Sequence, residues 1–157
     1  MEINGTYAFS ADQDAVWRLL MDPDAIAKAI PGVQEMIPIE GETNAWRAVA
    51  KIGVGAISGT YAGVVRLSDV EPPNRYRLTV SGEGQQSIIN GTALLTLTHD
   101  AEQQQTILTW DAEANVSGKL ASIGQRVVKS AAGLMSKMFF GALAKQLPVS
   151  EAVASDE

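Results

Sequence analysis

The chain begins with one strand-like segment, followed by two short helical segments. In residues 3–11, apolar and polar positions alternate up to a small turn, which is typical of a strand. From Val16 to Leu20 the apolar positions recur at helical spacing, and Asp12 is placed to cap this helix. The residues DPD end it, and a second short helix is expected over residues 25–30, where PG stops it.

Six further segments have the alternating pattern of strands. Turn-forming residues separate them at hairpin length, which predicts an antiparallel meander. Pro38 cannot donate a backbone hydrogen bond, so the first of these strands is expected at an edge or a bulge. The expected strands cover residues 33–40, 44–53, 56–70, 74–84, 87–100 and 104–116.

The last segment, residues 118–147, has the 3.6-residue period of a long helix, which Pro148 stops. Helical rotation places Lys119, Arg126, Lys129 and Lys137 roughly opposite the apolar face, for which we expect Leu120, Val127, Ala131, Leu134, Met135, Met138 and Ala142. We predict an α+β fold in which a curved antiparallel sheet of seven strands holds this helix across its concave face. A single domain is expected over residues 1–147, with a flexible acidic tail over 148–157.

Composition narrows the function classes. The 157 residues are 46% hydrophobic, as expected of a soluble globular protein, and no apolar run approaches the roughly 20 residues of a membrane span. A net charge of −6 argues against a general nucleic-acid binder. The absence of cysteine excludes disulfides, thiolate catalysis and zinc–thiolate sites. The N-terminus lacks the features of a signal peptide, so the cytoplasm is the expected location.

Charge is unevenly distributed along the chain. Residues 118–147 carry five basic side chains and no Asp or Glu, which leaves 7 basic against 18 acidic residues elsewhere. This basic helix is a candidate docking surface for an oxidoreductase or an anionic membrane, with Arg126, Lys129 and Lys137 beside Phe140. A solvated helix face explains the same pattern.

Residues 51–63, KIGVGAISGTYAG, contain four glycines and superficially resemble a phosphate-binding loop. Such a loop opens a helix whose first amides meet the anion, but here another strand follows, so a nucleotide site is not expected. Gly53 and Gly55 instead suit a tight hairpin. Gly63 suits a sheet bend, and it also suits space above the sheet for a ligand.

Residues able to perform catalysis are sparse. His99 is the only histidine and stands at a strand end entering a polar turn. Asp111 and Glu113 share a strand face opposite the apolar one, so they are expected in solvent. We expect no catalytic residue, no cofactor and no metal site, since acid–base chemistry needs such groups inside a pocket.

The inward faces of the predicted strands mix small residues with large aromatic ones. Small side chains that oppose each other across the core leave volume, and methionine adapts to irregular space, so this pattern is compatible with a ligand cavity. An ordinary filled core is equally compatible. The candidate cavity residues are Trp46, Ala48, Tyr61, Gly63, Tyr76, Leu78, Ala93, Leu95, Trp110, Ala112, Ala131, Leu134, Met135 and Met138.

Several stretches resemble the CoxG subunit of carbon monoxide dehydrogenase, a family of the SRPBCC or START-like helix-grip superfamily. They are DPDAIAKAIPGV, AKIGVGAISGTYAGVVRLSDVEPPNRYRLTVSGEG, GTALLTL and GKLASIGQRVV, and the resemblance covers about residues 1–147. It implies a seven-stranded sheet wrapped around a C-terminal helix, an apolar cavity and no catalytic motif. Some members continue into a long C-terminal extension with an apolar or amphipathic end, whereas this chain ends in VSEAVASDE.

The resemblance also implies a function. Members of the family are associated with recruiting molybdenum-containing CO dehydrogenases and related hydroxylases to the membrane, and with binding quinone-like lipids. The first hypothesis is therefore a non-enzymatic carrier of an apolar quinone or lipid that assists such an oxidoreductase. The second is a docking module that acts through the basic helix, with peripheral contact at the inner face of the membrane. The third is a cyclase-like enzyme, which would need polar groups in the cavity.

Overall fold

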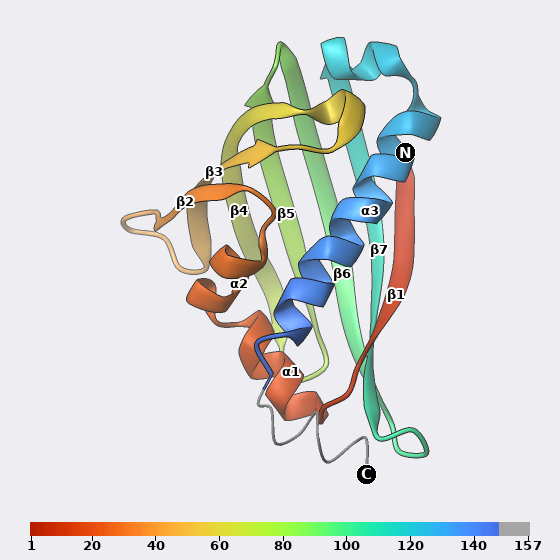
Figure 1. Ribbon diagram of the computed structural model, residues 1–157. Helices are drawn as coiled ribbons and strands as arrows, with labels where there is room; N and C mark the ends of the chain where they lie inside the picture. Colours follow the sequence, from red (N-terminus) through yellow and green to blue (C-terminus); the bar gives the residue numbers. More distant parts are fainter. Residues whose placement is uncertain (148–157) are drawn as a thin grey trace.

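The computed structural model, described over residues 1–147, contains one seven-stranded antiparallel sheet (Figure 1). The order across the sheet is β1-β7-β6-β5-β4-β3-β2, so the two strands on either side of the first helices form its edges. The strands are β1 Glu2–Phe9, β2 Val33–Pro38, β3 Ala45–Ile52, β4 Gly59–Glu71, β5 Arg75–Gly84, β6 Ser87–Asp100 and β7 Gln105–Gly118. The predicted α+β architecture is confirmed, and β2 with Pro38 is an edge strand with a register shift. The tail predicted over 148–157 lies outside the described residues.

Two short helices, α1 Gln13–Leu20 and α2 Pro23–Ala29, follow β1 and pack at one end of the sheet (Figure 1). Asp12 caps α1, because its carboxylate accepts a hydrogen bond from the Ala15 backbone nitrogen at 2.7 Å. Asp22 caps α2 in the same way through the Asp24 nitrogen, and Pro23 stands at the first helical position.

The long helix α3, Gln125–Ala144, crosses the concave face of the sheet diagonally (Figure 1). It begins later than predicted, because Gly118 and Gly124 adopt positive φ values of 81° and 97°. A 3₁₀ turn, η2 Lys119–Ile123, lies between these glycines. By length and hydropathy α3 is the one helix of residues 1–147 that could cross a membrane, but the core helix of a soluble protein meets the same criteria.

The predicted inward face of α3 is wrong. Val127, Leu134 and Met138 are exposed at 44%, 51% and 46%. The buried positions are Val128, Phe140 and Leu143. The prediction counted helical rotation from Leu120 across Gly124, where the α-helix is interrupted, so its phase was lost. Because α3 also carries apolar residues on its outer side, periodicity could not identify the correct face.

The core is divided into two clusters. The larger one joins α1, α2 and the C-terminal half of α3 to one end of the sheet, and Phe9, Val16, Leu108 and Leu143 are almost fully buried there. The smaller one joins Ile52, Ile57, Leu120 and Val128 near the start of α3.

Gly63 brings two strands together rather than opening space for a ligand. It pairs with Gly82 across β4 and β5, and a Cβ on Gly63 would lie 2.8 Å from the Gly82 Cα and closer still to the Ser81 carbonyl oxygen. The nearby hairpin also differs from the prediction, because a 3₁₀ turn, η1 Gly55–Ile57, connects β3 to β4. No α-helix follows the glycines, so the context of a phosphate-binding loop is absent there.

Gly63→Ala should lower the free energy of unfolding by about 1–3 kcal/mol, because the added methyl overpacks the β4–β5 contact. Gly91→Ala is the matched control, since Gly91 is also inside a strand but its Cβ would meet nothing closer than 3.6 Å. Urea unfolding of both variants measures the difference. Equal stability of the two variants would contradict the close approach.

Candidate functional site

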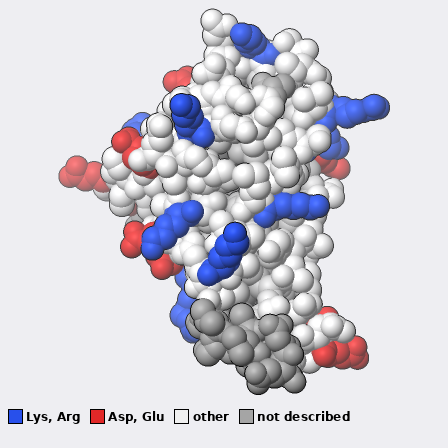
Figure 2. Space-filling model, in the orientation of Figure 1, with Lys and Arg blue, Asp and Glu red and all other residues white. Residues whose placement is uncertain are grey.

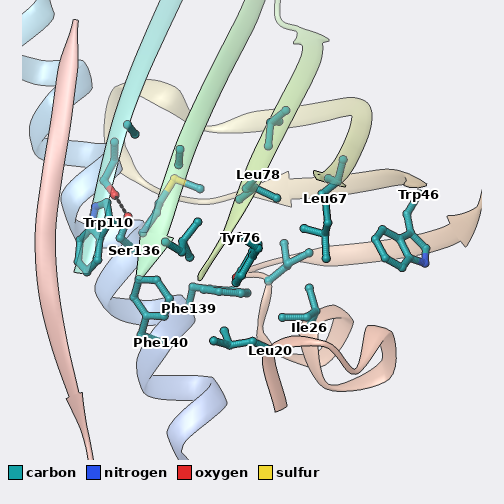
Figure 3. A pocket seen from close by; sticks show the side chains of 18 of the residues that line it. Leu20, Ile26, Trp46, Leu67, Tyr76, Leu78, Trp110, Ser136, Phe139 and Phe140 are labelled. Carbon is teal, nitrogen blue, oxygen red and sulfur yellow. Dashed lines mark hydrogen bonds between the residues drawn. The ribbon is translucent and has the colours of Figure 1, made fainter. Parts of the chain in front are cut away.

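A half-open pocket of about 380 Å³ lies between the concave face of the sheet and the helices (Figure 3). Its floor comes from all seven strands, and α1, α2 and α3 contribute the walls. The part of α3 that faces it carries Ala132, Met135, Ser136, Phe139 and Phe140. No Asp, Glu, Lys, Arg or His stands among the described residues that line it.

The structure places many of the predicted cavity residues in this pocket. Alternation along the strands identified the concave face, and Met135 was identified on α3. The predicted residues that line the pocket are Trp46, Tyr76, Leu78, Ala93, Leu95, Trp110, Ala112 and Met135.

Three predicted strand residues lie on the concave face but outside the pocket. Trp46 and Val65 pair in register and line it, whereas the next inward pair, Ala48 and Gly63, does not. Tyr61 belongs to the smaller core cluster, and its hydroxyl donates to the Ile57 carbonyl oxygen at 2.9 Å. The pocket therefore ends at the row of Trp46, a boundary that alternation alone cannot reveal.

The α3 predictions need correction because the helix is rotated. Leu134 and Met138 face solvent, and Ala131 packs in the smaller cluster. Ala132 takes the place that was expected for Ala131.

Phe140 also contradicts its prediction as part of the docking surface. It is 4% exposed and lies 5.0 Å from Trp110, measured between ring centroids. Arg126, Lys129 and Lys137 are exposed as expected. Phe140 is buried because the diagonal path of α3 brings its C-terminal half down onto the aromatic residues of the sheet (Figure 1).

Sequence reasoning missed the wall that α1, α2 and the following loop provide. Leu20, Ile26 and Pro31 line the pocket from these elements, although nothing in their local pattern points to it. The sheet residues Ile3 and Leu67 were also missed. Both continue the inward alternation of their strands, so that signal could have found them.

Three polar groups interrupt the apolar lining. The Ser136 hydroxyl donates to the Ala132 carbonyl oxygen at 2.9 Å (Figure 3). Tyr76 is 4% exposed, and its burial raises the pKa of the phenol, so it stays neutral. The Nε1 atom of Trp110 is buried without a hydrogen-bond partner among the described residues. Leaving such a donor unpaired costs about 1–3 kcal/mol.

The ionisable residues considered earlier lie elsewhere. His99, Asp111 and Glu113 are exposed, and the Glu113 carboxylate pairs with the N-terminal ammonium at 3.2 Å. Within residues 1–147, no group of three acidic or histidine side chains could hold a metal ion. The pocket offers apolar contact and a few neutral hydrogen-bonding groups, which suits binding an uncharged molecule.

Known proteins resemble this chain in sequence and in fold. A protein-family model for the CoxG subunit of carbon monoxide dehydrogenase matches residues 5–148. No curated protein matches. A conserved protein from Geobacillus kaustophilus is 33% identical with a TM-score of 0.86, over 93% of this chain and 94% of that one.

Two more distant structures support the fold alone. A START superfamily protein from Mycobacterium smegmatis is 12% identical, with a TM-score of 0.69 over 93% of this chain and 96% of its own. A protein from Chromobacterium violaceum is 18% identical, with the same TM-score and coverage. Since the CoxG model spans nearly the whole chain and the sheet and long helix have START-like neighbours, this chain belongs to the CoxG family of carbon monoxide dehydrogenase.

Proposed function

We propose that the protein binds an uncharged, largely apolar molecule, quinone-like or lipid-like, between the sheet and α3. The observation that carries the proposal is the half-open apolar pocket of about 380 Å³ without a charged lining residue. Ligand pockets of small molecules are typically about 300–1,000 Å³ and mostly apolar. Each buried CH₂ of a ligand would contribute about 0.8 kcal/mol.

The proposed role is that of an accessory protein, without catalysis of its own, for a CO dehydrogenase or a related molybdenum hydroxylase. The family is named after CO dehydrogenase, which supports this partner. A cyclase-like reaction is not favoured, because the described pocket residues include no carboxylate, histidine or lysine for proton transfer. We propose the cytoplasm as the place of action.

Ala132→Phe should weaken binding of the apolar quinone menadione by at least about tenfold, because the ring projects into the pocket and overpacking costs about 1–3 kcal/mol. Leu134→Phe is the control, since this position on the same helix is 51% exposed. Titration calorimetry gives both dissociation constants, and a thermal melt confirms folding. If the Ala132→Phe protein binds menadione as the parent does, the ligand does not occupy this pocket.

The outer side of α3 supports a second candidate function, contact with an anionic membrane. Val127, Leu134 and Met138 form an exposed apolar stripe, and the exposed Arg126, Lys129 and Lys137 lie beside it. Figure 2 shows basic side chains across this face, with acidic ones toward its edges. Apolar residues beside lysines suit a helix that lies on a membrane surface. An oxidoreductase with an acidic face is the alternative partner.

Reversing Lys129 and Lys137 to Glu should reduce co-sedimentation with phosphatidylglycerol vesicles at low salt by at least about tenfold, at about 1 kcal/mol per basic residue. The control reverses Arg47 and Lys51, which alternate with the pocket-lining Trp46 and so lie on the opposite sheet face. Equal loss in both double variants would mean that only net charge matters. No binding by the parent protein would remove the membrane contact.

A further inference from the structure

Two hydrogen-bond donors stand in one row on the floor of the pocket. Tyr76 of β5 pairs in register with Leu95 of β6, and Leu95 pairs with Trp110 of β7. All three residues line the pocket. Strands are about 4.8 Å apart, so the Cα atoms of the two aromatic residues are about 10 Å apart. Figure 3 shows their side chains on the same side of the sheet, with α3 beside them.

Neither donor is used within the protein. Trp110 Nε1 is the one buried side-chain nitrogen or oxygen of residues 1–147 that lacks a hydrogen-bond partner. No hydrogen bond of the Tyr76 hydroxyl occurs among these residues, although the side chain is 4% exposed. Native proteins rarely leave buried donors unpaired, so two of them in the wall of one pocket point to a ligand that completes them.

The position of the Trp110 indole is fixed from both sides. Gly5 pairs with Trp110 in register, and a Cβ on Gly5 would lie 2.5 Å from the indole Cζ2 atom. The ring can therefore lie against the β1 backbone only because residue 5 has no side chain. Phe140 of α3 contacts the same indole, with ring centroids 5.0 Å apart. Since the Nε1 atom is covered in this structure, a ligand oxygen reaches it when neighbouring side chains adjust.

The character of both donors restricts the matching ligand group. An indole nitrogen only donates, so its partner must be an acceptor. Burial raises the pKa of Tyr76, which keeps its hydroxyl protonated and able to donate. An ionised carboxylate would also accept, but no cationic side chain among the described lining residues would offset its desolvation. A neutral carbonyl oxygen meets both conditions.

We propose that the pocket selects its ligand by an uncharged carbonyl oxygen, which accepts hydrogen bonds from the Tyr76 hydroxyl and the Trp110 indole N–H. This inference rests on the proposed function and adds the polar group that the ligand must carry. Gly5 acts as a positioning residue, because it sets the orientation of the indole.

Menadione and 2-methylnaphthalene provide a matched pair of probes, because they share a ring skeleton and differ in the carbonyl oxygens. The chain has no cysteine that menadione could alkylate. Titration calorimetry measures both dissociation constants for the parent protein, Trp110→Phe and Tyr76→Phe. Each variant should bind menadione about fivefold to tenfold more weakly and leave 2-methylnaphthalene within about twofold, since each loses one hydrogen bond.

Tyr61→Phe is the control, because it removes a hydroxyl that is bonded to the Ile57 carbonyl outside the pocket. It should leave the ratio of the two constants unchanged. The ratio within one protein cancels a general loss of fit, and Tyr76→Phe alone decides if Trp110→Phe does not fold. An unchanged ratio in the folded variants overturns the carbonyl contact while the apolar pocket stands. If the parent binds neither probe, the proposed function fails as well.

Discussion

The packing of Phe140 onto the sheet is the contact on which the rest of the site depends. Its ring centroid lies 5.0 Å from that of Trp110, 5.8 Å from Tyr7 and 6.4 Å from Phe9. Together with the fully buried Leu143, this aromatic cluster holds the C-terminal half of α3 against the sheet. Because aromatic pairs bury large areas and prefer defined angles, they determine both the height and the rotation of the helix.

That rotation explains why a pocket remains. One turn or two before Phe140, α3 presents Ala132, Met135 and Ser136 to the sheet, where Ala93 and Ala112 face them with short side chains. Large side chains near Phe140 keep the helix raised, and small ones beyond it do not fill the resulting space. Interiors are normally close-packed, so an unfilled apolar volume of this size is typical of a binding site rather than of a core.

Much of the fold could be predicted from the sequence, and less of the site. Period-two alternation located the strands and the inward side of the sheet, including Tyr76, Leu95 and Trp110, because each strand has only two faces. The helix α3 has apolar residues around most of its circumference, so Leu134 and Met138 were assigned inward and Phe140 outward. The wall from α2 depends on how the chain folds back over the sheet, and no local pattern of Ile26 or Pro31 encodes that.

The central claim, an apolar ligand between the sheet and α3, is tested most directly by ¹³C-methyl NMR of the methionines during a menadione titration. The chain has five of them: Met21, Met36 and Met135 line the pocket, whereas Met1 and Met138 do not. We expect saturable shifts of the first three methyl signals and unchanged positions for the other two. Shifts centred on Met138 would place the ligand on the outer face of α3 and contradict the claim, as would the absence of any shift.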